Sequence, residues 1–283
     1  MSGKTCVITG ATDGIGLEAA LRLGALGARL VLVGRNRAKG EAALAWLHER
    51  IPGVGTEMHY ADLSRRGDIQ RLASELLATA PRIDVLLNNA GGFFERRMTT
   101  EDGLEHTFAL NHMGYFRLTA LLRERLIASA PARIVNVASE AHRGARLDFA
   151  DLQTARGYNG LKAYKRSKLA NILFTRALAR RLSGTGVTAN CLHPGFVATS
   201  FGDNNRGWWG WAIAIGKRLT AISVERGAET PVYLASSPDV AGVTGSYFDQ
   251  CRERQADAPA RNDADAERLW MESERLAGLA AGS

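Results

Sequence analysis

The chain contains few cysteines and no long apolar run. Its 283 residues include three cysteines, which lie far apart and form neither a Cys-x-x-Cys pair nor a spacing with histidine that would complete a metal site. No run of about 18 apolar residues offers a membrane span. A strand-like segment begins by Lys4, so we expect no signal peptide. These absences favour a protein without a metal centre, from a reducing compartment, either cytoplasmic or peripheral to a membrane.

Lysine is scarce as well. The net charge of +7 is carried by 30 arginines against six lysines, and the charges are scattered along the chain. Scattered charge is weak support for nucleic-acid binding, so we predict no nucleic-acid partner. Modest steering of an anionic cofactor, contact with an acidic membrane surface and plain compositional bias are the alternatives that the charge leaves open.

Short apolar, β-rich runs alternate with helical patterns along the chain. The expected strands cover 5–9, 28–33, 83–87, 133–138 and 187–192, with a further one ending near 60. The expected helices cover 14–26, 37–50, 67–80 and about 101–128, followed by one that carries 164–168 and one that starts near 225. This alternation predicts a Rossmann-type, doubly wound parallel α/β sheet of about seven strands, with helices on both faces.

No linker rich in proline, glycine or serine, no repeat and no low-complexity block divides the chain. With 46% hydrophobic residues it can bury one full core. We therefore predict a single domain over 1–283. A dinucleotide-binding half covers about 1–130, and a catalytic and substrate half covers about 131–283, with a lid at about 200–224.

A glycine-rich turn follows the first expected strand. Gly10, Gly14 and Gly16 stand between that strand and a helical pattern. Glycines permit positive φ and let backbone amides approach a pyrophosphate, which then sits at the positive end of the helix. The strand–turn–helix context favours a dinucleotide site over an ordinary Gly-rich βα turn.

The second expected strand is not followed by the carboxylate that NAD-binding proteins place on the ribose 2′-hydroxyl. The sequence there is Gly-Arg-Asn-Arg, from Gly34 to Arg37. The guanidinium of Arg35 is suited to a phosphate contact, so the cofactor is predicted to be NADP(H). The alternative is a surface arginine that opens the following helix.

Other polar residues follow later strands, at the sheet edge where ligands of open α/β sheets bind. Asp62 would meet the adenine or cap the next segment. The small and amide residues at 88–92 leave room for a flat cofactor, or form a tight turn. Ser139 would donate to a carbonyl oxygen, or serve as a turn or cap. Asn111 lies inside a helical pattern that it does not favour, so it needs a polar partner or solvent.

Tyr164 and Lys168 are four residues apart, so on a helix their side chains are neighbours on one face. Acid–base work near neutral pH needs the phenol pKa about 3 units below its usual value near 10, which corresponds to about 4 kcal/mol. An ammonium at about 4 Å supplies that order of energy at an effective dielectric of about 20. The pair indicates a phenol activated by a lysine, and the alternative is a solvated pair on an amphipathic helix.

The combined motifs resemble those of the short-chain dehydrogenase/reductase family. They occur in the family's order and strand context, and the resemblance covers essentially the whole chain. The matching residues are Thr9-Gly10-x-x-x-Gly14-x-Gly16, Asn88-Asn89-Ala90-Gly91, Asn111, Ser139, Tyr164-x-x-x-Lys168 and Pro194-Gly195.

Two segments further resemble the retinol dehydrogenase-like branch of that family. The first runs from 133 to 194 and includes Ser167-Lys168-Leu169-Ala170-Asn171, and the second covers 260–270. Two features depart from the branch. Its members often carry an N-terminal anchor, which we do not expect here, and the tryptophans at 208, 209 and 211 need not fit the same substrate.

The resemblance implies a role for each motif. Tyr164 would be the general acid or base, and Lys168 would lower its pKa and hold the nicotinamide ribose. Ser139 would polarise the substrate carbonyl, Asn111 would bind a water that links Lys168 to solvent, and Thr199 would contact the carboxamide side of the cofactor. The predicted cofactor-binding set is Gly10, Thr12, Asp13, Gly14, Ile15, Gly16, Arg35, Asn36, Lys39, Asp62, Leu63, Asn89, Ala90, Gly91, Tyr164, Lys168, Pro194, Gly195, Val197 and Thr199. His142 and His193 are expected to be structural.

The substrate prediction rests on the apolar, glycine-containing segment 206–224, which holds three of the five tryptophans. One interpretation is a lid over a lipophilic aldehyde or ketone such as retinal, with Trp208 and Trp209 joining Ser139 and Tyr164 in substrate binding. The indoles would also suit an acidic bilayer surface. A dimer contact or core packing are the structural alternatives, so a homodimer and a monomer both stay open.

The sequence thus predicts an NADP(H)-dependent oxidoreductase that transfers a hydride between nicotinamide and a hydrophobic alcohol, aldehyde or ketone. Alternatives are an NADP-binding regulatory protein without turnover and a reductase of small, non-lipid carbonyls. A sugar-nucleotide epimerase is less suitable because only about ninety residues follow the sixth expected strand, too few for the larger substrate domain of those enzymes.

Overall fold

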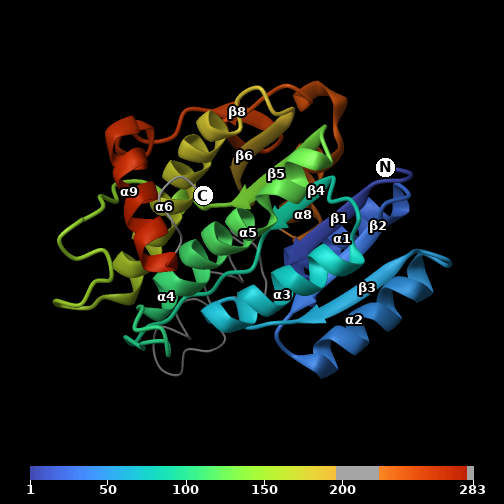
Figure 1. Cartoon of the computed structure of the whole chain (residues 1–283), viewed down its shortest axis with the longest axis horizontal. Helices are drawn as coiled ribbons and strands as arrows, with labels where there is room; N and C mark the ends of the chain where they lie inside the picture. The colour runs from blue at the N-terminus through green and yellow to red at the C-terminus, as the bar shows by residue number, and fades with distance from the viewer. Residues whose placement is uncertain (196–222, 279–283) are drawn as a thin grey trace.

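One eight-stranded sheet runs through the computed structural model, which describes residues 1–195 and 223–278 (Figure 1). The strand order is β3-β2-β1-β4-β5-β6-β7-β8. All neighbours are parallel except β7 and β8, which form an antiparallel hairpin at one edge. The strands are β1 (Thr5–Thr9), β2 (Arg29–Gly34), β3 (Thr56–Tyr60), β4 (Val85–Asn88), β5 (Ala132–Val137), β6 (Val187–His193), β7 (Tyr247–Asp249) and β8 (Arg252–Arg254).

The predicted doubly wound parallel sheet is confirmed, with eight strands in place of about seven. The additional pairing comes from β7 and β8, which have three residues each. Strands this short give almost no alternation of polar and apolar residues, so the sequence pattern could not delimit them.

Helices cover both faces of the sheet because alternate strand residues point to opposite sides. Val7, Val31 and Ile134 belong to a core shared with α3, α5, α6 and α9, whereas Ile8 and Leu32 belong to one shared with α1, α2 and α8. The helices are α1 (Gly14–Ala25), α2 (Arg37–Arg50), α3 (Arg66–Thr79), α4 (His106–Phe108), α5 (Gly114–Ala128), α6 (Gly160–Arg181), α8 (Val224–Ser236) and α9 (Asp263–Ala277). Short 3₁₀ turns lie at η2 (Glu140–His142), η3 (Pro238–Val240) and η4 (Ala258–Arg261).

The chain order of the strands reverses between β1 and β4, which are hydrogen-bonded neighbours in the centre of the sheet. Loops after such strands leave the sheet in opposite directions and open a crevice at its carboxyl edge. The glycine turn after β1, the Asn-rich segment after β4 and Ser139 after β5 all follow strands at this edge. The fold therefore gathers the predicted motifs from distant parts of the sequence.

The helix expected over about 101–128 starts later and is not regular. Residues 101–105 are not helical. An isolated β-bridge pairs Thr99 with Glu105, and the helix begins at His106. The buried Glu105 carboxylate accepts hydrogen bonds from the amides of Thr107 and Phe108, both at 2.8 Å, and so fixes that start. A π-turn, η1 (Ala109–Met113), then separates α4 from α5. Such turns insert one extra residue and often occur at functional sites.

Most of the predicted lid lies outside the described residues. Of the range 200–224, only Ser223 and Val224 are described, and they cap and begin α8. Among the described residues, no helix combines the length and apolarity needed to cross a bilayer.

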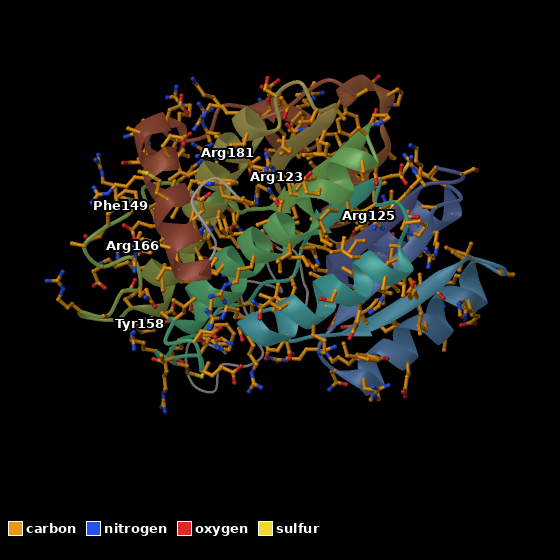
Figure 2. All side chains as sticks on the ribbon, viewed as in Figure 1. Arg123, Arg125, Phe149, Tyr158, Arg166 and Arg181 are labelled. Atoms are coloured by element: carbon orange, nitrogen blue, oxygen red, sulfur yellow. The ribbon has the colours of Figure 1, made fainter. Side chains whose placement is uncertain are left out.

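The C-terminal helix α9 packs across α5 and α6. Its Trp270 ring stacks on Phe174 at 5.9 Å and meets Phe116 edge-on at 5.0 Å. Arg181 projects from α6 beside α9, with its guanidinium 4.1 Å from the Trp270 ring centre (Figure 2). The same arginine pairs with Glu267 at 2.6 Å. One aromatic side chain therefore fills the junction of three helices.

We expect Trp270→Ala to lower the free energy of unfolding by about 3 to 5 kcal/mol, because it removes a large buried ring and leaves a cavity. Met271→Ala, the next residue on α9, is the control. Its side chain is 60% exposed, so the change should be within about 0.5 kcal/mol. Urea unfolding of both variants measures this, and equal losses would contradict the packing described for α9.

Candidate active site

The glycine turn is shaped by three glycines with different tasks. Gly10 and Gly14 have φ of 65° and 51°, a region that residues with a Cβ avoid. Gly16 lies on α1, where an added Cβ would come 2.2 Å from the carbonyl oxygen of Gly10. The turn can therefore keep its tight path only with glycine at these positions. The amides of the first turn of α1 consequently lie beside β1, as the pyrophosphate prediction requires.

Asn89 and Ala90 are fastened to this turn from β4. The Asn89 amide donates to the carbonyls of Thr9, at 2.9 Å, and Gly10, at 3.2 Å. The Thr9 hydroxyl accepts from the backbone amides of Asn89 and Ala90 at 2.9 and 3.1 Å. Four hydrogen bonds thus join the ends of β1 and β4. Asn89 and Ala90 are predicted cofactor residues, whereas Thr9, which opens the glycine motif, had no predicted role of its own.

Thr12 and Asp13 connect the turn to β2 and α2. The Thr12 methyl packs on Gly34, where an added Cβ would come within 2.3 Å of it. Asp13 is the N-terminal cap residue of α1, but its side chain does not bond the helix amides, and it pairs with Lys39 at 3.1 Å. Ile15, the remaining residue predicted from this turn, is partly buried.

Arg35 follows β2, as predicted, and is 61% exposed. Its guanidinium lies 3.5 Å from the carboxylate of Asp62. Burial acts to raise the pKa of Asp62, but hydrogen bonds from Ser64 and the charge of Arg35 outweigh it and hold that pKa below its usual range. Asp62 is therefore an anion that already partners the predicted phosphate ligand.

The neighbouring residues Asn36 and Leu63 have structural contacts. The Asn36 side chain caps α2 by accepting from the Lys39 amide at 3.0 Å. Leu63 is buried, and its carbonyl oxygen would lie 2.8 Å from a Cβ added at Gly114, the first residue of α5. Asn36 thus orients α2 beside Arg35, and Leu63 joins the end of β3 to α5.

Asn111 lies in the π-turn, fully buried, and its amide is satisfied by three hydrogen bonds. Its Nδ2 donates to the Gly92 carbonyl at 2.9 Å and to the Ser167 hydroxyl at 3.0 Å, and its Oδ1 accepts from the Gly92 amide at 2.8 Å. These bonds supply the polar partners that Asn111 was expected to need. They also connect the segment after β4 with α6. Ser167 had no separate role predicted from the sequence.

The start of α6 fits closely against the segment after β4, and this contact places Tyr164. The side chain of Asn159 caps α6, and a Cβ added at Gly160 would come 2.4 Å from the Phe94 carbonyl. One turn later the Tyr164 ring meets Phe93 edge-on at 6.0 Å. Glycine at 160 therefore lets the two segments approach.

Lys168 is buried at the end of β5. Its Nζ donates to the Val137 carbonyl at 3.0 Å and lies 5.7 Å from the centre of the Tyr164 ring. Gly91 faces the same ammonium, since a Cβ there would stand 3.5 Å from it. Tyr164, Lys168 and Gly91 are thus brought together as predicted, but the backbone contact at Val137 carries no side-chain signal that a sequence could reveal.

Ser139 has the capping task that the sequence left open, and it also contacts Tyr164. Its Oγ accepts from the Ala141 amide at 3.1 Å and so caps η2. Its hydroxyl also hydrogen-bonds the Tyr164 phenol, an interaction that acts to lower the phenol pKa. Ser139 and Tyr164 can therefore address one substrate oxygen together.

Burial shifts the pKa values of the pair in the direction opposite to the sequence-based expectation. It raises the pKa of Tyr164 to about 12, against the smaller effect of Ser139. It also lowers the pKa of Lys168 to about 7. The expectation counted the attraction between phenolate and ammonium but not the desolvation of each ion. At neutral pH the phenol is therefore protonated, which is the form that a general acid needs.

His142 and His193 brace the segments beside Ser139, in line with the structural role expected. His142 hydrogen-bonds the Ser139 carbonyl through Nδ1 at 2.7 Å, and its Nε2 accepts from the Asp257 amide. The Nδ1 of His193 accepts from the amides of Glu140 and Gly195 at 3.1 and 3.3 Å. Burial lowers the pKa of both rings, so both are neutral.

Pro194 and Gly195 follow β6 at the same sheet edge, and Gly195 has a φ of 89°. The remaining predicted site residues, Val197, Thr199, Trp208 and Trp209, lie outside the described residues. In the part of the chain that the structure describes, no group of three histidine, cysteine or acidic side chains could hold a metal ion.

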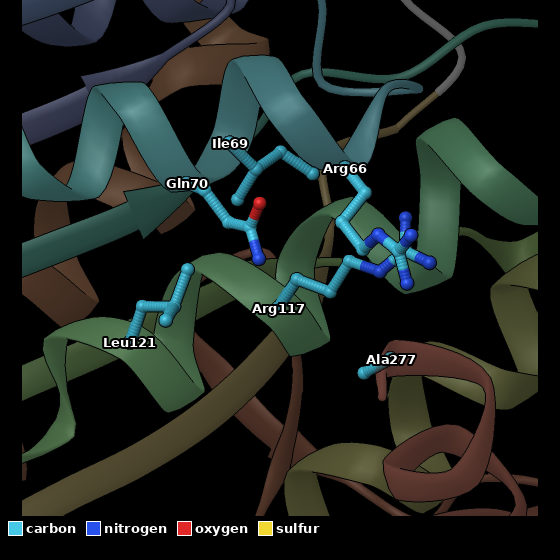
Figure 3. A pocket seen from close by; sticks show the side chains of 6 residues that line it. All are labelled: Arg66, Ile69, Gln70, Arg117, Leu121 and Ala277. Atoms are coloured by element: carbon cyan, nitrogen blue, oxygen red, sulfur yellow. The ribbon is translucent and has the colours of Figure 1, made fainter. Parts of the chain in front are cut away.

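A pocket between α3, α5 and the end of α9 is separate from this site (Figure 3). The guanidiniums of Arg66 and Arg117 approach each other at one side of it, and the Gln70 amide points into it. Its lining residues are Arg66, Ile69, Gln70, Arg117, Leu121 and Ala277. None of the candidate catalytic residues lines it, so it is not the substrate site.

The comparison with protein families agrees with the geometry. The model of the family described as short chain dehydrogenase matches residues 4–209. The chain belongs to the short-chain dehydrogenase family. Its relatives include human retinol dehydrogenase 14, which is 42% identical over 99% of this chain and 88% of its own, and human retinol dehydrogenase 13, 40% identical over 99% and 86%. Mouse retinol dehydrogenase 12 is 40% identical over 98% of this chain and 87% of its own.

Solved structures share the fold. A protein from Mycobacterium paratuberculosis has a TM-score of 0.77 at 30% identity, covering 98% of this chain and 94% of its own. L-Sorbose reductase from Gluconobacter frateurii, solved with NADPH and L-sorbose, has a TM-score of 0.70 at 24% identity, covering 88% and 95%. The chain is therefore an oxidoreductase of the retinol dehydrogenase-like branch of this family, acting on alcohol or carbonyl groups with a nicotinamide cofactor.

The depressed pKa of Lys168 predicts a pH-dependent stability. The lysine takes up a proton near pH 10.5 when unfolded but only near 7 when folded. The free energy of unfolding should therefore fall by a few kcal/mol as the pH drops from about 10 to 7, and level off below 7. Lys168→Met should remove most of this slope. Lys162→Met, an exposed lysine on the same helix, should keep it.

Urea unfolding at pH 7, 8 and 9 without cofactor measures the difference between the three proteins. Burial raises the pKa values of the Cys6 and Cys191 thiols, so these groups change the stability with pH in the opposite direction. All three proteins contain both thiols, so their contribution cancels in the comparison. Identical slopes in wild type and Lys168→Met would show that the lysine stays charged when buried.

Proposed function

We propose that the chain is an NADP(H)-dependent oxidoreductase that uses Tyr164 as its general acid and base on a hydrophobic carbonyl or alcohol. The observation that supports it best is the position of the Tyr164 phenol, hydrogen-bonded to Ser139 and packed near the buried Lys168, at the sheet edge that carries the glycine turn. A regulatory nucleotide-binding protein would have no need for a phenol held in this way.

The residues present fit a dinucleotide. Side chains at Gly10, Gly16 and Gly91 would fill the space beside β1 and β4 or clash with backbone and amide groups there. The turn amides would hold the pyrophosphate, Asp62 would meet the adenine, and Asn89 and Ala90 would line the ribose. Bound there, the nicotinamide would supply or accept the hydride.

The protein's own side chains handle the proton. In reduction, Tyr164 donates its phenolic proton to the substrate oxygen while the Ser139 hydroxyl donates a hydrogen bond to the same atom. Lys168 has one N–H directed at Val137, which leaves two donors for the phenolic oxygen and the ribose hydroxyls. In oxidation the proton moves in the opposite direction, from the substrate hydroxyl to Tyr164. The water bound by Asn111 stays a prediction.

Arg35 supports the choice of NADP(H) over NAD(H). A 2′-phosphate would accept charge-assisted hydrogen bonds from its guanidinium, with Lys39 one helical turn further on. Both cations face carboxylates, Arg35 at Asp62 and Lys39 at Asp13. These carboxylates hold the cations in place, and they also reduce the net attraction for the phosphate.

We expect wild-type protein to prefer NADPH, and Arg35→Asp to lower the ratio of kcat/KM for NADPH over NADH by about 10- to 100-fold, because a cation is replaced by an anion facing the phosphate. Arg29→Met is the matched control. It removes an arginine from the other end of β2, where Arg29 pairs with Glu57, and should leave the ratio unchanged. Equal kcat/KM for both cofactors in the wild type would refute the NADP(H) assignment.

The hydrophobic substrate class rests on two observations of sequence. The relatives at about 40% identity are named retinol dehydrogenases, and the segment 206–224 is rich in tryptophan. The lid, the contact with an acidic membrane and the choice between monomer and homodimer belong to this proposal as well. A substrate panel should therefore include all-trans-retinal, a long-chain aldehyde and a short one.

Tyr164→Phe should lower kcat by at least about 100-fold with every active substrate, because the ring stays but its exchangeable proton is lost. Binding of NADPH, followed by its fluorescence, should change little. Tyr158→Phe is the control, since that hydroxyl bonds the Phe94 carbonyl at 3.0 Å and has no part in proton transfer. Wild-type protein that binds NADPH but turns over no carbonyl would favour the regulatory alternative.

A further inference from the structure

Two consecutive residues of the π-turn contact α6 in different ways. Asn111 bonds Gly92 and, on α6, Ser167 at the active site. His112 is fully buried among Phe108, Phe116 and Phe174, the last of which belongs to α6, at ring distances of 5.1 to 6.3 Å. The extra residue of a π-turn changes the angular spacing of its side chains. A shift of the His112 side chain therefore also moves the neighbouring Asn111.

The hydrogen bond of His112 favours one tautomer. The Ser273 hydroxyl on α9 donates to the Leu269 carbonyl at 2.7 Å, which leaves its oxygen to accept from His112 Nε2, 2.8 Å away. This arrangement favours the form with the proton on Nε2. Burial lowers the pKa of His112 to about 3, so the ring stays neutral. Its unprotonated Nδ1 has no hydrogen-bond partner among the described residues.

Asn171 belongs to α6 and contacts the carbonyl that holds Lys168. Its Nδ2 donates at 3.3 Å to the Val137 carbonyl, the same oxygen that accepts from Lys168 Nζ at 3.0 Å. Its Oδ1, like His112 Nδ1, has no hydrogen-bond partner among the described residues. His112 is therefore held by Ser273 of α9 and by its neighbours in the π-turn, and not by a hydrogen bond to Asn171.

A histidine in this place needs a reason beyond packing. Three phenylalanine rings surround it, and a fourth would fill the space without any polar atom to desolvate. A buried imidazole costs free energy unless its N–H and lone pair are used. The bond to Ser273 uses the N–H.

We propose that His112 is a positioning residue for the active site, which fixes Asn111 through the π-turn, using the C-terminal helix α9 as its anchor. This rests on the proposed function only for its catalytic consequence. The hydrogen bond between the helices is independent of it.

The test combines four variants. His112→Phe keeps an aromatic ring and removes both nitrogens, Ser273→Ala removes only the acceptor, and the double variant removes both partners. His112→Gln places an N–H where Nε2 stood. Glu267→Gln is the control, because it weakens ion pairs between α9 and α6 at the surface without touching His112.

We expect His112→Phe to lower kcat about tenfold or more while the KM for NADPH changes by less than about twofold. Ser273→Ala should lower kcat less, and the double variant should be no worse than His112→Phe, since one interaction is being removed twice. His112→Gln should recover part of kcat. Glu267→Gln should lower the melting temperature and leave kcat unchanged.

Three results would overturn the proposal. One is a His112→Phe variant that loses stability but keeps kcat, which would make His112 a core residue only. Another is additive loss in the double variant. The third is a ¹⁵N NMR spectrum of the cofactor-free protein that shows the His112 proton on Nδ1 and not on Nε2. The His112 signals would be assigned by comparison with the His112→Phe variant. The NMR result does not depend on turnover, so a wild type inactive on all carbonyls would refute the proposed function without deciding this bond.

Discussion

Burial of the Lys168 ammonium is the constraint on which the site depends. Removing a charged amine from water costs several kcal/mol, and the depressed pKa of Lys168 reflects that cost. The Val137 carbonyl offsets part of it, which requires β5 to end at this residue and α6 to lie directly over that end. The close fit of Gly160 against Phe94 and the bonds of Asn111 hold α6 there. Much of the local packing can be understood as support for one charged group.

The surroundings of Lys168 also separate the features that the sequence could predict from those that it could not. Spacing alone placed Tyr164 beside Lys168, and strand–turn–helix context placed Gly10, Gly16 and Arg35, because these depend on local periodicity and on the edge rule for parallel sheets. The direction of the pKa shifts depends on how much water remains around each ion, which a spacing cannot reveal. The π-turn at Asn111 was hidden for a similar reason: its apolar neighbours fit a regular helical pattern, and the bonds that deform it come from Gly92 and Ser167.

Other features could not be predicted from the sequence because they depend on partners that are far apart in the chain. The pairing of Arg35 with Asp62 joins β2 to β3, and the late helix start at His106 depends on a buried carboxylate, Glu105, that the helical pattern would have absorbed. The β7–β8 hairpin is too short to give a period. In each case the residue type was visible in the sequence, but its partner was set by tertiary packing.

The position of α9 has a consequence for how the enzyme is made. The glycine turn, Ser139, Tyr164 and Lys168 are all synthesised well before Asp263, where α9 begins. A domain generally folds as a unit, so a chain that ends before α9 lacks part of the core that the complete domain needs. Phe116, Phe174 and His112 would then present an uncovered apolar surface until Trp270 and Ser273 emerge. A chain without α9 therefore exposes apolar side chains that the complete protein buries.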